Sequence, residues 1–186
     1  MRRKLLTALV AACALTGVLV GPASASAATL TLNNSLEEPA KVANFPDGTG
    51  LEVQGTSLAC ETFALQSEIT KNAADPVTLK ITGANISGCT VSGFPLEYSE
   101  IQSNYMKLNA NGTGQLHLKV KETSKIWTCE REGILNLTYT EGKVTASGEM
   151  MKTSGTVFCF NVHNWKTTFS PATDEFSSPI DWVITP

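Results

Sequence analysis

The sequence predicts an all-β fold, an antiparallel β-sandwich or barrel, and three observations support this prediction. Apolar and polar residues alternate with a period of two in several short runs, which is typical of strands that bury one face. Asp-Gly, Asn-Gly and Glu-Gly pairs lie between runs, and such pairs favour tight turns that join antiparallel strands. No segment shows a sustained helical period, so the strands are expected to pack on one another.

The N-terminal region has the features of a secretory signal peptide. The basic start "MRRK" precedes an apolar run from Leu5 to Val20, and small residues follow as far as Ala27. The run is shorter than the roughly 20 residues that a membrane-spanning helix needs. We therefore expect a signal peptide over residues 1–27, with Ala23–Ala25 as an alternative cleavage motif. A single secreted β-domain over residues 28–186 would remain, with no membrane span.

Cys13 allows a second interpretation of the same region. The segment "VAAC" that ends at Cys13 resembles a bacterial lipobox, in which the cysteine is lipidated and anchors the protein. The apolar run continues past this cysteine to Val20, whereas a lipidated cysteine normally ends such a run. Ordinary cleavage and secretion are therefore favoured over lipoprotein anchoring.

The charge balance limits the kinds of partner. Cleavage after residue 27 removes three of the 14 basic residues and leaves 11 against 17 acidic ones, a formal charge of −6. Nucleic acids and anionic membrane surfaces bind clustered positive charge, so neither is expected as a partner of a chain with this balance. The acidic residues are scattered, which indicates a solvated surface. A cell-surface glycan, a lipid or a protein is left as a possible partner.

Six alternating runs predict strands and the residues that they bury. In chain order, the buried residues expected are Leu51 and Val53; Phe63 and Leu65; Val77, Leu79 and Ile81; Leu116, Leu118 and Val120; Leu135, Leu137 and Tyr139; and Ile180, Trp182 and Ile184. The stretch that contains Phe63 and Leu65 also fits one or two helical turns.

One further run is apolar on both faces. In "GTVFCFNV", residues 155–162, Val157 and Cys159 lie opposite Phe158 and Phe160. A strand of this kind is expected in the middle of a sheet, where both faces are covered.

Turns are predicted at three glycines. The pairs Asp47-Gly48, Asn111-Gly112 and Glu141-Gly142 each provide a residue that adopts positive φ easily. The last pair is expected to join residues 133–140 and 143–150 in a hairpin.

Cys60, Cys89, Cys129 and Cys159 are predicted to form two disulfides, because an even number of cysteines in an exported chain is typical of such a framework. Separations of 29 and 30 residues favour the pairs Cys60–Cys89 and Cys129–Cys159 over nested pairing, which would close a loop of 99 residues. The glutamate after Cys60 and the one after Cys129 are expected to point to water. The repeated Cys-Glu pairs also suggest two similar halves, each with one disulfide.

A family resemblance adds to this interpretation. The Ser87-Gly88-Cys89 motif, the second pair of cysteines, the Thr/Gly/Ser-rich strands and the signal peptide resemble a broad group of small secreted actinobacterial proteins of unknown function. The resemblance covers roughly residues 51–165. It implies no catalytic residue and no ligand-binding residue.

Catalytic and metal sites find little support in the sequence. Glu97 and Glu100 are the nearest approach to a carboxylate pair, but a spacing of three places them on opposite faces of a strand. His117 is expected to face outward among lysines, and His163 to pack beside Trp165. The spacing of cysteines and histidines fits no zinc site, and no G-x-S-x-G motif is present, so neither a metal nor a cofactor is expected.

Trp127 has two interpretations. It lies two residues before Cys129 and so on the same face of a strand, where the indole would cover the disulfide in the core. It could instead be an exposed aromatic platform for sugars or lipids.

Three functions stay open at this point. A non-catalytic, disulfide-stabilised binding or structural domain outside the cell is favoured, because no catalytic motif supports an enzyme. The alternatives are a small barrel that carries an apolar ligand such as a lipid, and an exported hydrolase.

Overall fold

The computed structural model describes residues 28–186 except 35, 55–57, 92, 100–103 and 141–142, and the side chains of 47–54, 58 and 99 are also outside the description. The predicted signal peptide with Cys13, the Glu141-Gly142 turn and Glu100 therefore lie outside the described residues. So do the side chains of Leu51 and Val53.

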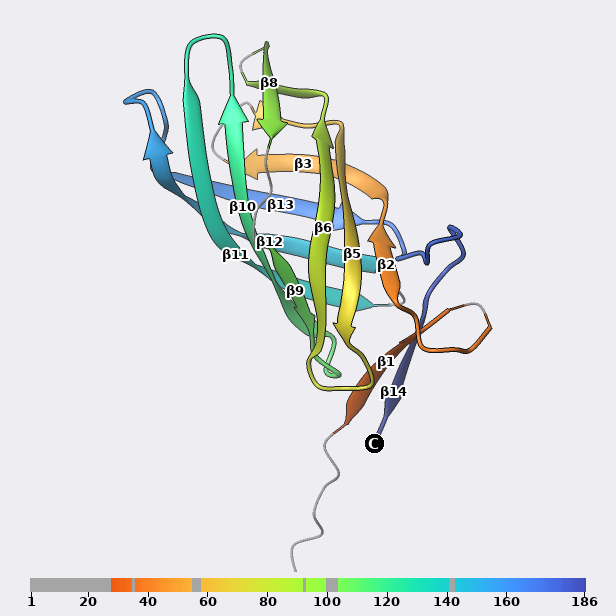
Figure 1. Ribbon diagram of the computed structural model, residues 1–186. Coiled ribbons are helices and arrows are strands. Elements are labelled where there is room, and N and C mark those ends of the chain that lie inside the picture. The colour runs from red at the N-terminus through yellow and green to blue at the C-terminus, as the bar shows by residue number, and fades with distance from the viewer. Residues whose placement is uncertain (1–27, 35, 55–57, 92, 100–103, 141–142) are drawn as a thin grey trace, which may run out of the picture.

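The described chain is all β (Figure 1). None of the described residues forms a helix, and hence none forms one that could cross a membrane. The strands are β1 (Thr29–Asn33), β2 (Val42–Phe45), β3 (Asp47–Gln54), β4 (Leu58–Ala59), β5 (Thr62–Lys71), β6 (Val77–Ser87), β7 (Cys89–Val91), β8 (Phe94–Ser99), β9 (Tyr105–Leu108), β10 (Thr113–Thr123), β11 (Thr128–Thr140), β12 (Lys143–Gly155), β13 (Val162–Phe169) and β14 (Asp181–Thr185).

One antiparallel sheet contains 12 of these strands and curls into a half-barrel. Its order is β11-β12-β13-β3-β4-β7-β8-β10-β9-β6-β5-β2, and β10 pairs in addition with β11. In Figure 1, β5, β6 and β10 run along the front of the molecule while β3, β12 and β13 cross behind them at a steep angle. The predicted sandwich or barrel is therefore confirmed, with two layers in a nearly orthogonal arrangement.

Aromatic side chains fill the space between the layers. Phe63 of β5 contacts Trp165 and Phe169 of β13, with ring centroids 6.3 and 5.2 Å apart. Phe45 of β2 packs edge-on against Phe169, and Tyr98 of β8 packs edge-on against Trp165. Because these contacts join strands of the front and the back, they hold the curled sheet closed over its core.

Two glycines allow β11 and β12 to bend together. A Cβ atom at Gly133 would collide with the carbonyl oxygen of Glu149, and one at Gly148 would lie 2.9 Å from the carbonyl oxygen of Ile134. The backbones of the two strands thus approach each other at these glycines more closely than side chains permit.

A two-stranded sheet of β1 and β14 closes one end of the half-barrel. Leu30 and Leu32 of β1 are fully buried, and Trp182 of β14 packs on Tyr139 with ring centroids 4.6 Å apart. In Figure 1 this pair lies at the bottom, far from β8 and from the connection between β10 and β11.

Most of the predicted strand faces are confirmed where side chains are described. The residues found buried as expected are Phe63, Leu65, Val77, Leu79, Ile81, Leu116, Leu118, Val120, Leu135, Leu137 and Ile180. Tyr139 and Trp182 are partly buried, whereas Ile184 is half exposed, so its predicted burial is wrong. The ambiguous stretch around Phe63 is the long strand β5, not a helical turn.

The turn predictions have mixed outcomes. Asn111-Gly112 lies in the connection between β9 and β10, with Gly112 at a φ of 83°, and β11 pairs with β12 as the expected hairpin. The turn predicted at Asp47-Gly48 is wrong, since both residues belong to β3 and Asp47 pairs with Phe169. At Pro46 the chain passes from β2, which pairs with β5, to β3, which pairs with β13. It does not reverse its direction there, as it would in a hairpin.

The interior strand predicted at residues 155–162 is also wrong. Strand β12 ends at Gly155 and β13 begins only at Val162, so the segment between them is a loop. Gly155 has a φ of 123°, and a Cβ atom there would lie 2.8 Å from the Sγ atom of Cys159. The loop therefore turns back on itself at Gly155, and its apolar side chains leave the sheet.

Both predicted disulfides, Cys60–Cys89 and Cys129–Cys159, are present, one in each half of the sequence. All four cysteines are buried, whereas Glu61 is exposed and Glu130 partly exposed, as expected. Glu130 follows Cys129 within β11, but Cys60 and Glu61 lie between β4 and β5 and not in a strand.

Candidate binding site at the loop end of the half-barrel

Three loops meet at the end of the half-barrel opposite β1 and β14, and we call this region the loop end. They are the connection between β7 and β8 with its flanking residues Val91 and Phe94, the connection between β10 and β11 (124–127), and the connection between β12 and β13 (156–161). Figure 1 shows the first two at the top of the molecule and the third beside them.

The first two loops enclose an apolar pocket of about 260 Å³. Its lining residues come from segments about 30 positions apart in the sequence: Val91, Phe94, Pro95, Ser124, Lys125, Ile126 and Trp127. Lys125 carries the one charged side chain among them. We call this cavity the Trp127 pocket, because the indole gives it its largest aromatic surface.

Ser124 fixes the position of Trp127. The Ser124 hydroxyl oxygen accepts hydrogen bonds from the backbone N–H groups of Ile126 and Trp127, at 3.3 and 3.2 Å. The Ser124 backbone N–H donates to the Trp127 carbonyl oxygen at 2.9 Å, which closes the turn. A serine turn of this kind replaces strand pairing with local hydrogen bonds, so the indole is held at the pocket wall.

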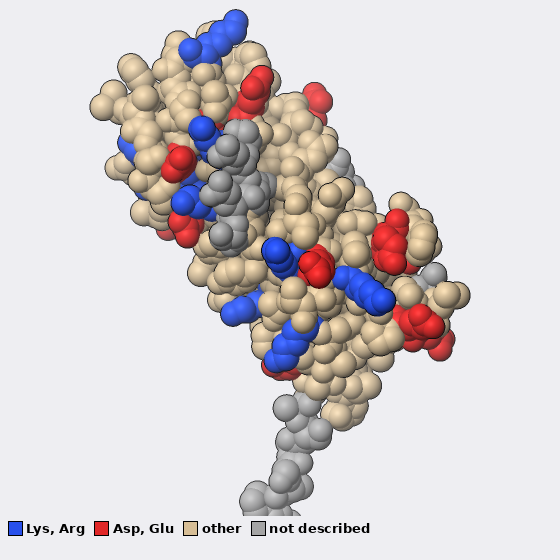
Figure 2. Space-filling model, in the orientation of Figure 1, with Lys and Arg blue, Asp and Glu red and all other residues tan. Residues whose placement is uncertain are grey.

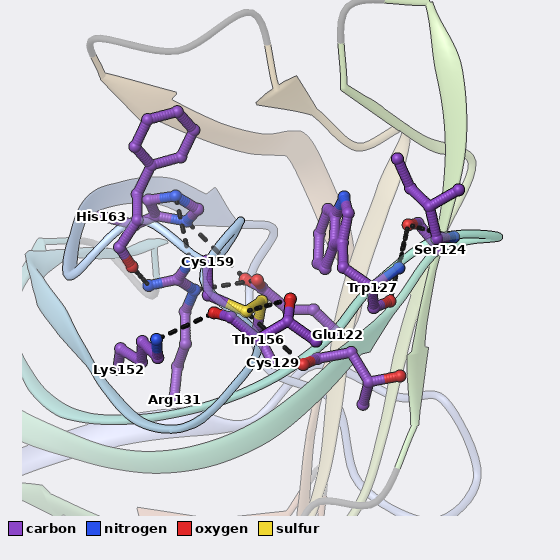
Figure 3. The surroundings of a disulfide bond; sticks show 12 residues. Glu122, Ser124, Trp127, Cys129, Arg131, Lys152, Thr156, Cys159 and His163 are labelled. Carbon is purple, nitrogen blue, oxygen red and sulfur yellow. Dashed lines mark hydrogen bonds and ion pairs between the residues drawn. A yellow bond between two sulfur atoms is a disulfide. The ribbon is translucent and has the colours of Figure 1, made fainter.

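A smaller cavity of about 70 Å³ adjoins the Trp127 pocket and shares Val91 and Trp127 with it. The Cys129–Cys159 disulfide lines this cavity together with Arg131, Phe158, Phe160 and His163. Figure 3 shows the Trp127 indole on one side of the disulfide, with Arg131 and His163 on the other.

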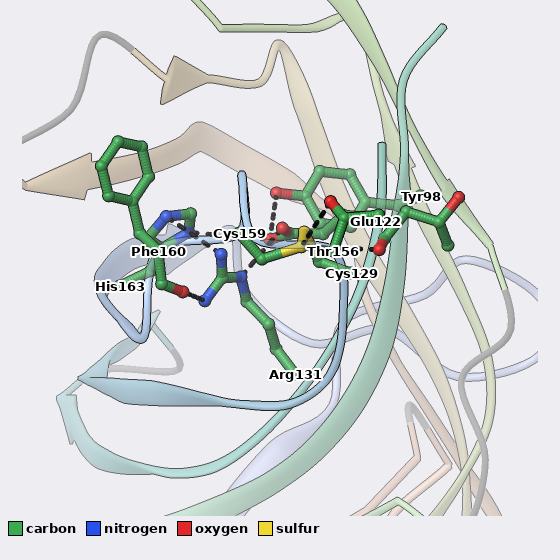
Figure 4. A network of polar contacts seen from close by, with 9 residues as sticks. Tyr98, Glu122, Cys129, Arg131, Thr156, Cys159, Phe160 and His163 are labelled. Atoms are coloured by element: carbon green, nitrogen blue, oxygen red, sulfur yellow. Dashed lines mark hydrogen bonds and ion pairs between the residues drawn. A yellow bond between two sulfur atoms is a disulfide. The ribbon is translucent and has the colours of Figure 1, made fainter. Parts of the chain in front are cut away.

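Beneath the smaller cavity lies a buried polar network (Figure 4). The Nε atom of Arg131 donates to Oε2 of Glu122 at 2.8 Å, and both side chains are almost completely buried. The Tyr98 hydroxyl donates to Oε1 of Glu122 at 3.2 Å. Arg131 also donates through Nη1 to the carbonyl oxygen of Phe160 at 2.8 Å, so the network holds the third loop as well as the strands.

His163 completes the network. Its Nε2 atom lies 3.2 Å from Nη2 of Arg131, and its Nδ1 atom lies 3.7 Å from Oε1 of Glu122. Because a guanidinium can only donate, Nε2 must accept and the ring hydrogen is assigned to Nδ1, which faces the carboxylate. The buried cation and the carboxylate thus satisfy each other, which an interior of low dielectric requires.

The alkaline stability of the fold is expected to depend on Tyr98. Burial raises the pKa of the Tyr98 phenol well above its ordinary value of 10.0, and the Glu122 carboxylate beside it adds to the rise. A phenol with a raised pKa in the folded state contributes stability below pH 10, and this contribution is lost as pH rises toward the folded pKa. Between pH 9 and 11 the free energy of unfolding should fall with pH more steeply in the wild type than in Tyr98→Phe, by up to about 1.4 kcal/mol per pH unit. Urea unfolding of both proteins measures this difference. An identical slope in both proteins would show that the phenol is not buried in this way.

The structure places the residues singled out in the sequence in different environments. Glu97 is exposed on β8, and Glu100, its candidate partner, lies outside the described residues. His117 faces outward on β10 as predicted, opposite the buried Leu116 and Leu118. Its side chain is nevertheless only 18% exposed, because its Nε2 atom lies 2.9 Å from Oε1 of Glu132 and its ring stacks on Tyr105.

His163 and Trp127 both belong to the loop end. His163 is buried beside Trp165 as predicted, but it also faces the smaller cavity and the network. Trp127 is partly buried against the core and lines the smaller cavity together with the disulfide, and it also lines the Trp127 pocket. Glu122, Arg131 and Ser124 were not singled out from the sequence.

Comparison of the chain with protein-family models, curated proteins and solved structures finds no match. Among the residues that the structure describes, no three histidine, cysteine, aspartate or glutamate side chains are grouped as a metal site would need.

Proposed function

We propose that this chain is an exported, disulfide-stabilised and non-catalytic binding domain whose ligand places an apolar group in the Trp127 pocket. The observation that carries the proposal is a concave apolar pocket with an indole in its wall, fixed by a serine turn. Pockets of this kind, with few polar groups, are the usual sites for small apolar ligands.

The size of the pocket limits what it can hold. A volume of about 260 Å³ lies just below the range of roughly 300–1,000 Å³ typical of sites that enclose whole drug-sized ligands. The pocket therefore suits one aromatic ring or a short acyl chain. The polar part of the ligand would stay outside, beside Lys125 and the second hollow of about 210 Å³ that Lys125 also lines.

The buried network supports binding over catalysis. A general acid or base must reach the substrate with a hydrogen-bonding atom that is free to exchange a proton. Glu122 is instead engaged by Tyr98 and Arg131, and the carboxylate lies in the core beneath the cavity. These groups are better suited to hold the loop end in place than to transform a ligand.

Export is supported by the disulfides. Bridges such as Cys60–Cys89 and Cys129–Cys159 persist in oxidising compartments and are rare in the cytosol. They agree with the signal peptide that the sequence predicts.

The proposal is tested by titrating the purified protein with decanoate below its micelle concentration, with calorimetry as the readout. The wild type should bind saturably, and Trp127→Ala should weaken binding about tenfold or more, because a buried aromatic side chain is worth about 1.5–3 kcal/mol. Trp182→Phe is the matched control, since this second partly buried tryptophan lies in β14 at the other end of the half-barrel.

Soluble oligosaccharides are titrated in parallel. If a sugar binds saturably and its binding requires Trp127, while decanoate does not bind, the ligand is a glycan and not an apolar molecule. Loss of decanoate binding in Trp182→Phe and Trp127→Ala alike would place the ligand elsewhere.

A further inference from the structure

The loop end carries exposed apolar side chains that extend beyond the Trp127 pocket, which only Phe94 and Ile126 among them line. Val157, Phe158 and Phe160 of the third loop are 91%, 66% and 65% exposed, and Ile126 and Phe94 of the other two loops are 76% and 68% exposed. Large apolar side chains at such exposure on one end of a protein mark a site of interaction with a partner or a membrane.

These side chains are held outward and do not belong to a loop that is free to fold down onto the protein. The Cys129–Cys159 disulfide ties the third loop to β11, and Arg131 binds the carbonyl oxygen of Phe160 from below. Lys152 donates through its backbone N–H to the Asn161 carbonyl oxygen at 2.8 Å. The apolar tips thus stay in water unless something covers them.

The charge of the three loops is also distinctive. Residues 91–94, 124–127 and 156–161 contain no acidic residue, and Lys125 is their only charged residue, although the sequence as a whole has more acidic than basic residues. On the face seen in Figure 2, basic and acidic side chains are interspersed over the surface. Glu97 on the adjoining β8 lines a hollow together with Lys125, and Glu130 on β11 lies opposite Lys121.

We infer that the loop end docks on the interface of a phospholipid bilayer, with the apolar tips inserted among the headgroups and Lys125 at phosphate level. Val157, Phe158 and Phe160 protrude from the third loop, and a bilayer can receive such apolar tips without a surface of complementary shape. Aromatic and aliphatic tips enter the interface, and a lysine adds attraction to anionic lipid. This docking goes beyond the proposed function, because the tips act whether or not the Trp127 pocket is filled.

The test is sedimentation of the purified protein with vesicles of phosphatidylcholine, alone or mixed with phosphatidylglycerol. The wild type should bind both, and more tightly to the mixed vesicles. Val157→Ser/Phe158→Ser should weaken binding to both about tenfold or more, because two apolar side chains are lost from the insertion. Lys125→Gln should remove the preference for mixed vesicles.

Phe176→Ser is the matched control. Phe176 is 81% exposed, but it lies between β13 and β14, at the opposite end of β13 from the third loop. This variant should bind vesicles as the wild type does. Neither Val157 nor Phe158 lines the Trp127 pocket, so the double variant should keep its affinity for decanoate, and loss of docking is distinguishable from loss of the pocket.

Three outcomes would overturn the inference: a wild type that does not sediment with either vesicle, equal binding by the double variant, or equal loss in Phe176→Ser. A concentration-dependent dimer that Val157→Ser/Phe158→Ser abolishes, in a protein that ignores vesicles, would instead identify the loop end as a contact between two copies of this chain.

Discussion

Arg131→Met is expected to destabilise the fold by about 3–5 kcal/mol, the usual cost of leaving one partner of a buried ion pair without the other. The Glu122 carboxylate would remain fully buried with only the Tyr98 hydroxyl as a close hydrogen-bond partner. The Phe160 carbonyl oxygen would also lose its donor, so the third loop should loosen. Urea unfolding at neutral pH, followed by tryptophan fluorescence, measures the change.

Two variants make this prediction specific to the pair. Glu122→Leu/Arg131→Met removes both charges and should be more stable than Arg131→Met, since apolar pairs of similar volume often replace buried ion pairs without loss. Lys166→Met removes a cation from an exposed position on β13 and should change stability by less than about 0.5 kcal/mol. A double variant no more stable than Arg131→Met would mean that the pair is not energetically coupled.

Replacing Cys129 and Cys159 with serine is expected to cost about 3–4 kcal/mol. A bridge that closes a loop of 30 residues removes about this much entropy from the unfolded chain. The same variant should bind vesicles more weakly, because the loop that carries Val157 and Phe158 is no longer tied to β11.

The other disulfide is the matched comparison. Cys60→Ser/Cys89→Ser opens a loop of 29 residues and should lose nearly the same stability in denaturant unfolding. It should weaken vesicle binding less than the loss of Cys129–Cys159 does, because Cys60–Cys89 holds β7 beside Phe94 of β8 but not the loop that carries Val157 and Phe158. Equal loss of vesicle binding in both variants would point to general unfolding, and unchanged stability in either would contradict the entropic argument.

The alternation of residues could have revealed the buried network. Glu122 follows Leu116, Leu118 and Val120 at the same spacing of two, and so belongs to the buried face of β10. Arg131 shares the face of Leu135 and Leu137 in the same way. A strict count along each strand thus predicts a buried acid and a buried base on paired strands, although it does not show that the two side chains meet.

Other features could not be predicted from local sequence. The loop at residues 156–161 has the composition of a buried strand, but the conformation of Gly155 and the disulfide at Cys159 turn it outward. The Trp127 pocket depends on how far the sheet curls, which brings Phe94 next to Ile126. Such a meeting of distant loops is set by the pairing of β8 with β10, and periodicity within one segment carries no information about it.

The pairing of β1 with β14 has a practical consequence for how the molecule can be handled. Thr29 lies directly opposite Thr185, at the pole farthest from the loops (Figure 1). An affinity tag next to Thr29 or Thr185 would therefore attach the protein to a solid support by this pole. The tryptophan-lined hollow would then face the solution and be accessible to ligands in a binding assay.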